Sequence, residues 1–286
     1  MRRSIAIQFV RRSSLLAAIL LPGIGICLAS PTFAQTSTRL AEPKPLTEFP
    51  PKGKFHIYLL MGQDNMIGRG KVSDEDRKLA SRVVKLDREG RWVPAVDPLH
   101  SENLAIDGVG PGLSFGRLVS ADDDTITVGL VPCAKPGSPL TSWQPEGSAY
   151  RNAIKQAKLA QERGTLKGIL WHHGEYDGRL RVQSATYGIR LAEIVLAFRK
   201  DVHEPQLPFI AARMADFVRP DRIPYANRIN SALDRLPREV RYVSLVNTDH
   251  LTPIGGTDDF DARSARELGV RFAKTVRDLR FEQARK

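Results

Sequence analysis

The feature that most constrains the fold of this chain is the alternation of short apolar runs with longer amphipathic segments. The stretches "TITVGLVP" from Thr125 and "KGILWH" from Lys167 are almost continuously apolar, as strands buried on both faces of a parallel sheet are. The candidate strands span residues 55–61, 81–86, 125–132, 166–172, 208–212 and 241–246. The candidate helices span residues 112–120, 149–162, 184–201, 225–236 and 261–281. This order predicts an α/β domain, with a mainly parallel sheet between two layers of helices.

The N-terminal segment has the pattern of a secretory signal peptide. An apolar run from Leu15 to Ala29 follows several arginines, and Thr32-Phe33-Ala34 forms a small-x-Ala cleavage pattern. The run is too short and wrongly flanked for a stable membrane span. Its "RRSSLL" also resembles a twin-arginine signal. We therefore expect a signal peptide over residues 1–34, a proline-rich tether over 35–53, one domain over 54–286, and a secreted or periplasmic protein.

Charge and cysteine content exclude some classes of protein. Without the four arginines of the leader, the formal charge falls from +11 to +7. The excess is scattered, with no basic block of the kind that binds nucleic acid. After removal of Cys27 with the leader, Cys133 is the remaining cysteine, so no internal disulfide is expected. We expect no nucleic acid partner and no cofactor.

Unusual residues follow four of the candidate strands, at the edge where α/β folds place their sites. The first loop is Gly62-Gln63-Asp64-Asn65-Met66 and the second runs from Cys133 to Trp143. The third is "WHHGEYD" from Trp171, and the fourth is "GTDDFD" from Gly256. The carboxyl ends of parallel strands lie at one edge, so these loops are predicted to converge.

These residues resemble the sialate O-acetylesterase family of carbohydrate esterases, a branch of the SGNH-type hydrolases. The blocks "GPGLSFGRLV", "GILWHHGEYD", "LPFI" and "FDARSARELGVRFA" occur in the order and spacing of that family. The resemblance implies a flavodoxin-like three-layer α/β/α sandwich. It also implies hydrolysis of O-acetyl esters on sugars by a serine nucleophile and a histidine base.

At the functional positions of the family, however, this chain carries other residues. The nucleophile position is Asp64, the base position is Asp259 and the position that orients the base is Gly256. The first glycine of the oxyanion-binding pair is Pro136, which has no N–H to donate. The glutamine of the third loop is His173. Gly62, Gln63, Asn65, Gly137 and Glu175 keep the family residue and, with Pro136 and His173, are the expected binding residues.

These replacements remove what acyl transfer requires. A nucleophile must be deprotonated by a base that a third group holds, and donors must face the developing oxyanion. Asp64 would form an anhydride and would repel an oxyanion, and the ordinary pKa of an aspartate such as Asp259 is far from neutrality. We therefore expect a degenerate esterase that binds carbohydrate or acetylated glycan. The alternative is a hydrolase of sugar esters or glycosides in which Asp64 and Asp259 form a carboxylate pair, with or without a metal.

Several residues have a simpler interpretation beside a functional one. Asp64 suits a tight turn, His250 is a solvated loop histidine or a substitute base, and Cys133 is a buried small hydrophobe. Ser138 has no evident base beside it. Trp143 and Trp171 are core or pocket wall rather than a platform for sugar. Asp64, Asp259, Glu175 and His173, with Asp177 and Asp258 nearby, form an oxygen-rich set that hard cations accept, but without a fixed ligand spacing we expect no metal.

Overall fold

The structure is a computed structural model that describes residues 44–100, 103 and 105–284. The predicted signal peptide lies outside these residues, as does the first half of the predicted tether. All the described residues belong to one compact unit.

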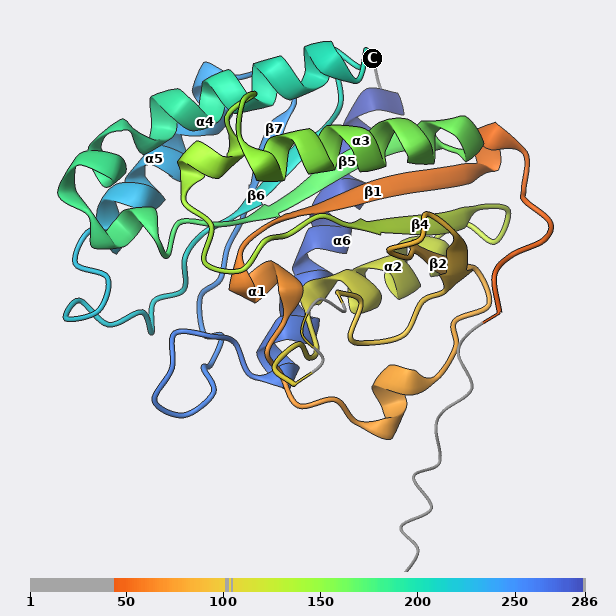
Figure 1. The fold of residues 1–286 in the computed structure, drawn as a ribbon, viewed down its shortest axis with the longest axis horizontal. Coiled ribbons are helices and arrows are strands. Elements are labelled where there is room, and N and C mark those ends of the chain that lie inside the picture. The colour runs from red at the N-terminus through yellow and green to blue at the C-terminus, as the bar shows by residue number, and fades with distance from the viewer. Residues whose placement is uncertain (1–43, 101–102, 104, 285–286) are drawn as a thin grey trace, which may run out of the picture. The chain divides into compact units, whose positions relative to one another are not determined.

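The described residues form a seven-stranded sheet in the order β3-β2-β4-β1-β5-β6-β7 (Figure 1). The strands are β1 (Phe55–Gly62), β2 (Val83–Leu86), β3 (Trp92–Pro94), β4 (Thr127–Pro132), β5 (Thr165–His172), β6 (Phe209–Ala212) and β7 (Val243–Val246). All neighbouring strands pair in parallel except β3, which is antiparallel to β2 at one edge of the sheet. The prediction of a mainly parallel sheet is therefore confirmed.

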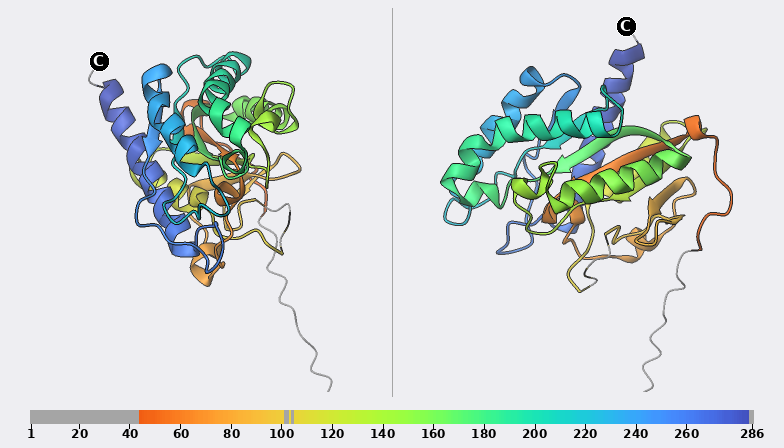
Figure 2. Two further views of the ribbon diagram at one scale, coloured as in Figure 1. Left: turned by 90° about the vertical axis from the view of Figure 1, so that its left-hand side faces the viewer. Right: turned by 45° about the horizontal axis from the view of Figure 1, so that its top comes forward.

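Helices cover both faces of the sheet. They are the short α1 (Asp64–Ile67), α2 (Pro111–Ala121), α3 (Ser148–Arg163), α4 (Arg181–Asp201), α5 (Ala226–Glu239) and α6 (Ala262–Ala284). Figure 2 shows α3 and α4 across one face and α6 along the other, where α6 packs on α2. These layers make the three-layer α/β/α sandwich that the sequence predicts.

The side chains of β1 show why this strand is apolar along its whole length. Ile57 and Leu59 pack in the core beneath α3, α4 and α5, whereas Tyr58 and Leu60 pack in the core beneath α2 and α6. All four are completely buried. Because successive side chains of a strand point to opposite faces, a strand with helices on both sides needs apolar residues at every position.

Some elements differ from the prediction. The strand β3 and the one-turn helix α1 were not expected from the sequence, because three or four residues carry no readable periodicity. Part of the predicted tether packs on the domain: the Leu46 N–H donates to the Trp92 carbonyl over 2.8 Å, and the rings of Phe49 and Phe55 lie 6.3 Å apart. Among the described helices, none combines the length and the apolar composition that crossing a membrane requires.

Candidate active site

The loop after β1 is held against the loop after β5 by backbone contacts. Gly62 has a φ of 133°, and a Cβ at this position would lie 1.9 Å from the carbonyl oxygen of His172, so only glycine fits. The Gln63 N–H donates to the same carbonyl over 2.9 Å, and Gln63 Oε1 accepts the Gly174 N–H over 2.9 Å. These contacts present Asp64 as the first residue of α1, at the carboxyl edge of the sheet.

The carboxylate of Asp64 is fixed on both of its oxygens. Oδ1 pairs with the Arg69 guanidinium at 2.5 Å, and Oδ2 accepts the backbone N–H of Gly137 over 2.8 Å. Arg69 also pairs with Asp107 at 2.7 Å. The Asp64 carboxylate thus accepts the Gly137 N–H. The resemblance assigns this backbone donor to binding of the oxyanion. Asp64 also links the first loop to the second.

Asn65 links the first loop to the other two. Its Nδ2 donates to Glu175 Oε1 over 2.9 Å and to the Asp258 carbonyl over 3.1 Å. Its Oδ1 accepts the Phe260 N–H over 2.8 Å. With the Asp64–Gly137 contact, these bonds show that the four predicted loops converge at one place.

Glu175 is a buried carboxylate that holds the third loop. Its Oε1 lies 3.3 Å from His172 Nδ1. Burial favours the neutral acid, but the electrostatic interaction with His172 and the hydrogen bond from Asn65 outweigh burial and lower the pKa of Glu175 to about 2. Glu175 is therefore ionised at neutral pH, and its contacts are those of a loop support.

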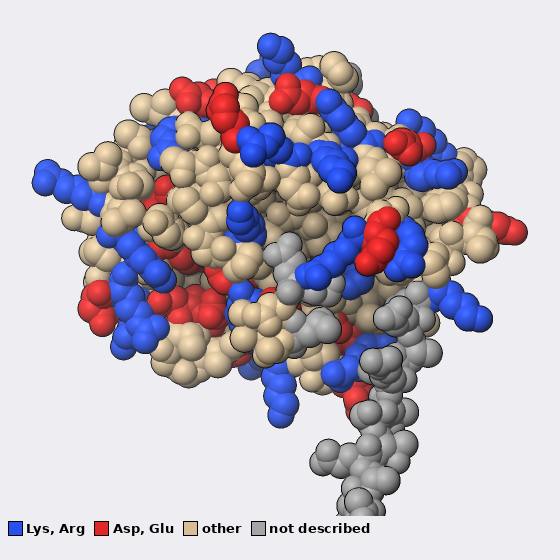
Figure 3. All heavy atoms as spheres, viewed as in Figure 1, with Lys and Arg blue, Asp and Glu red and all other residues tan. Residues whose placement is uncertain are grey.

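Asp259, the family base position, lies close enough to Asp64 for their charges to interact. Burial, followed by the negative charges of Asp64 and Glu175, raises the pKa of Asp259 above its ordinary value. Its neighbour Asp258 pairs with Arg222 at 3.5 Å. Figure 3 shows acidic side chains gathered at the left of the molecule, where Figure 1 places the carboxyl ends of the strands. Burial is the largest cause of the Asp259 pKa shift, and the charge of Asp64 adds to it in the same direction.

Two other replaced positions face solvent. Gly256 has a φ of 77°, and no atom lies within 4 Å of a Cβ built there, so an aspartate at this position would start in a conformation that side chains rarely adopt. Pro136 is exposed, as is Gly137. Gly137 donates its N–H to the Asp64 carboxylate at the surface, and Pro136 directly precedes it in the sequence.

His173 does not face this site. It is completely buried, with its ring stacked on Trp171 at 4.9 Å. Its Nε2 lies 3.0 Å from the Ser138 carbonyl oxygen and its Nδ1 lies 3.2 Å from the Tyr187 hydroxyl. Burial lowers the pKa of His173 to about 4, so the ring is neutral at pH 7. His173 supports the second and third loops from within the core.

Ser138 and Cys133, the other possible nucleophiles, are both buried and have structural roles. Ser138 is buried, donates to the Lys135 carbonyl over 2.9 Å and accepts the Trp143 indole N–H over 3.0 Å. Cys133 is buried, and burial raises the pKa of its thiol to about 12, which agrees with the prediction of a small hydrophobe. Trp143 and Trp171 are completely buried, so neither offers a platform to a sugar.

Two further alternatives lie apart from the Asp64 carboxylate. His250 is exposed, with a φ of 63°, and lines a pocket with Arg263 and Glu267 of α6. Asp177 is buried and accepts the Leu140 N–H over 2.8 Å. Within the part of the chain that the structure describes, no group of three or more His, Cys, Asp or Glu side chains could hold a metal ion.

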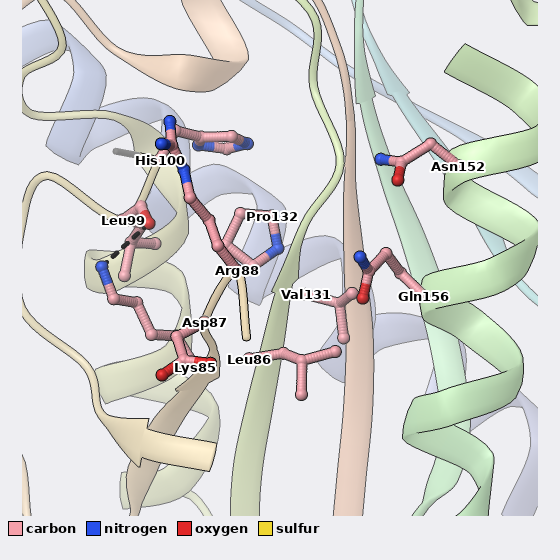
Figure 4. Close-up of a pocket in the computed structure, with 10 residues that line it drawn as sticks. All are labelled: Lys85, Leu86, Asp87, Arg88, Leu99, His100, Val131, Pro132, Asn152 and Gln156. Carbon is pink, nitrogen blue, oxygen red and sulfur yellow. Dashed lines mark hydrogen bonds between the residues drawn. The ribbon is translucent and has the colours of Figure 1, made fainter. Parts of the chain in front are cut away.

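A pocket of about 240 Å³ lies at the carboxyl ends of β2 and β4. Figure 4 shows the amides of Asn152 and Gln156 pointing toward it from α3, with His100 on the opposite side. His100 Nε2 accepts the Ala134 N–H over 3.3 Å, and burial lowers the pKa of His100 to about 3. The neutral ring therefore supports the backbone that leads to Gly137.

Sequence reasoning missed Arg69, which neutralises Asp64 and joins it to Asp107. A signal was present, because Arg69 follows Asp64 by five residues in "GQDNMIGRG". An aspartate in place of a serine needs a cation nearby when it is partly buried. The nearest arginine in the sequence was the natural candidate.

The sequence matches a known protein family over most of its length. The family model described as "Carbohydrate esterase, sialic acid-specific acetylesterase" matches residues 54–278. The chain belongs to this family. The probable carbohydrate esterase At4g34215 of Arabidopsis thaliana is 30% identical over 178 residues, which are 56% of this chain and 68% of the relative.

Solved structures of carbohydrate esterases share the fold of this family member. The structure of the Arabidopsis thaliana protein has a TM-score of 0.72 at 25% identity, over 80% of this chain and 99% of that one. The structure of NanS has a TM-score of 0.65 at 16% identity, over 82% and 100%. A carbohydrate acetylesterase from Xanthomonas citri has a TM-score of 0.57 at 17% identity, over 76% and 54%. The SGNH-type sandwich is therefore the fold of this chain.

Proposed function

We propose that this member of the acetylesterase family is a secreted carbohydrate-binding protein that has lost ester hydrolysis. The observation that carries the proposal is the position of the Asp64 carboxylate. This carboxylate accepts the Gly137 N–H and forms an ion pair with Arg69. An esterase needs a hydroxyl nucleophile at this place and a free N–H donor for the oxyanion.

The scaffold around Asp64 supports retention of binding. Gln63 and Asn65 link the first loop to the third and fourth loops through buried hydrogen bonds, as an intact ligand site requires. The chemistry, by contrast, lacks a base. Asp259 has a raised pKa, but a carboxylic acid cannot activate a nucleophile that is itself a carboxylate. Loss of these groups together leaves little of the rate enhancement that a triad provides.

A second candidate function rests on the same raised pKa. If Asp64 and Asp259 share protons, one acts as an acid and the other as a base, as in hydrolases of glycosidic bonds. The contacts of Asp64 with Arg69 and Gly137 weigh against this function, because they hold Asp64 as a fully engaged carboxylate.

The test is a set of hydrolysis and binding assays on the protein without its leader. Substrates are p-nitrophenyl acetate, acetylated xylan, O-acetylated sialic acid and p-nitrophenyl glycosides, and binding is measured with the same glycans by calorimetry. We expect glycan binding without turnover. Turnover above about 1 s⁻¹, the ordinary range for enzymes, that is lost in Asp64→Ala would contradict the proposal and favour the carboxylate pair.

A further inference from the structure

A second pocket lies at the amino ends of the strands, at the opposite end of the sheet from the four loops. Its walls come from the first residues of β1 and β5, the segment before β6 and the last turns of α6. Figure 1 shows β1 running from this end of the sheet, at the right, to α1 at the left. The volume of about 430 Å³ falls in the range of roughly 300–1,000 Å³ that is typical of small-molecule sites. What this pocket binds is therefore a question separate from the proposed function.

Much of the wall of this pocket is aliphatic. Leu166 and Leu207 belong to the core beneath α3, α4 and α5, whereas Val276 and Leu279 belong to or pack on the core beneath α2 and α6. The pocket therefore borders both cores at the end of the sheet. Aliphatic side chains offer no hydrogen bonds to the hydroxyls of a sugar, and a hydrocarbon group that covers them is removed from water.

Lys167 lines this pocket from a bulge in β5. In the pairing of β1 with β5, Ile57 lies opposite Leu166 and Tyr58 lies opposite Gly168, so Lys167 has no partner on β1. A bulge of this kind re-aims the side chain of the extra residue. Lys167 is half-buried, and its ammonium group makes no hydrogen bond or ion pair with the described residues. Its positive charge is therefore left without a partner from the protein.

Arg280 is a second cation of the pocket. Its Nη2 donates to the Tyr58 hydroxyl over 2.6 Å and lies 3.4 Å from His56 Nδ1, and no acidic side chain of the described residues pairs with it. Burial, followed by the charges of Lys167 and Arg280, lowers the pKa of His56 to about 4, so this ring is neutral at pH 7. Among the described residues that line the pocket, the one acid is Glu204, which forms no ion pair with either cation. Two positive charges therefore stand against one negative charge.

The wall and the charges of the pocket together select a class of ligand. The aliphatic wall matches a hydrocarbon group, and the two cations match an anionic group that accepts hydrogen bonds. A neutral sugar matches neither feature, and the excess of positive charge disfavours a cation. We propose that this pocket binds an organic anion with an aliphatic chain, and that the carboxylate or phosphate of this anion lies between Lys167 and Arg280.

The experiment measures binding to the protein without its leader at pH 7 by calorimetry. The probes are octanoate, octyl phosphate, acetate and 1-octanol, which separate the chain from the charge. We expect at least one of the two chain anions to bind tenfold or more tightly than both acetate and 1-octanol, and the tighter of the two identifies the head group. Lys167→Gln should weaken this binding about tenfold. The matched control is Lys155→Gln at an exposed position of α3, which should leave binding unchanged.

A second measurement needs no variant. A bound anion offsets the two positive charges that lower the pKa of His56, so a saturating amount of the tighter probe should raise this pKa in an NMR titration. If acetate or 1-octanol binds as tightly as the chain anions, or if neither chain anion binds, the inference about the ligand is wrong. If Lys167→Gln and Lys155→Gln have equal effects, or if the pKa of His56 does not move, the anion does not bind in this pocket. None of these outcomes affects the test of glycan binding, because the two sites lie at opposite ends of the sheet.

Discussion

The replacement of Asp64 by alanine should lower the stability of this protein. The side chain closes two contacts, one to the Gly137 N–H at 2.8 Å and one to the Arg69 guanidinium at 2.5 Å. Alanine leaves the N–H without its acceptor and leaves Arg69 with Asp107 as its remaining acidic partner. The first and second loops also lose their direct side-chain link.

The size of the effect follows from the exposure of these groups. A hydrogen bond to a charged group contributes about 1.5–3 kcal/mol when it is buried. The Asp64 side chain is 30% exposed, so its ion pair with Arg69 adds less, roughly 0–1 kcal/mol. Removing the charge also relieves its repulsion with Asp259, which offsets part of the loss. We expect a net destabilisation of about 1.5 kcal/mol. This corresponds to about 3–6 °C in Tm for a domain of this size.

Urea and thermal unfolding at pH 7 measure the difference. Asp64→Asn is the intermediate variant, because its amide oxygen still accepts the Gly137 N–H while the charge is lost, so it should fall between wild type and Asp64→Ala. Asp74→Ala is the control, since the Asp74 side chain is fully exposed and its ion pair with Arg77 is long, at 3.8 Å. This control should leave Tm unchanged.

The opposite result would refute the reasoning. Working active sites commonly hold unfavourable charges, and removing one of them raises stability at the expense of activity. If Asp64→Ala is as stable as wild type or more so, Asp64 is a strained functional group. The carboxylate-pair hydrolase would then be the better account of this site.

Three further predictions test the other positions. A quadruple variant should gain acetylesterase activity that Asp64→Ser alone lacks; it combines Asp64→Ser, Asp259→His, Gly256→Asp and Pro136→Gly. The reason is that nucleophile, base and orienting group act together. A folded but inert quadruple variant would show that the loss of function extends beyond these four positions. Asp259→Asn should be more stable than wild type at pH 7. Since the pKa of Asp259 is raised in the fold, its contribution falls as pH rises, so the gap measured in urea should close toward pH 3, and a gap that is constant with pH would contradict this cause. Glu175→Gln should cost about 3 kcal/mol at pH 7, and this difference should shrink as pH falls toward the Glu175 pKa of about 2; an unchanged urea midpoint at pH 7 would show that its charge is not needed.

Much of the fold was predictable because buried parallel strands leave a direct mark on composition. The runs that form β4 and β5 are apolar at nearly every position, and their ends were predicted to within two residues. The strand β3 was missed because an antiparallel edge strand of three residues, Trp92–Pro94, has neither length nor alternation. Short elements obtain their structure from the neighbours they pair with, and a sequence pattern cannot show that pairing.

For the site, convergence was predictable and side-chain direction was only partly so. Asp64, Asn65 and Glu175 meet because their strands end at the same edge. His173 points into the core with Trp171, two residues before it. The period-2 alternation of a strand would have placed His173 and Trp171 on one face. For the ion pair of Arg69 with Asp64 the sequence offered only their closeness along the chain, since the contact depends on how the chain turns after α1.

The contacts of residues 46–49 have a consequence for the solubility of the domain. The strand β3 ends the sheet, and an unprotected edge strand offers its backbone to the edge of another molecule. The Leu46 N–H donates to the Trp92 carbonyl on this strand. The ring of Phe49 packs on the ring of Phe55, which in turn contacts the ring of Trp92. A protein trimmed to begin at Lys54, the boundary that sequence suggests, would lose both coverings. Its bare edge and the uncovered aromatic rings would favour self-association, although every residue of the acetylesterase-like site would still be present.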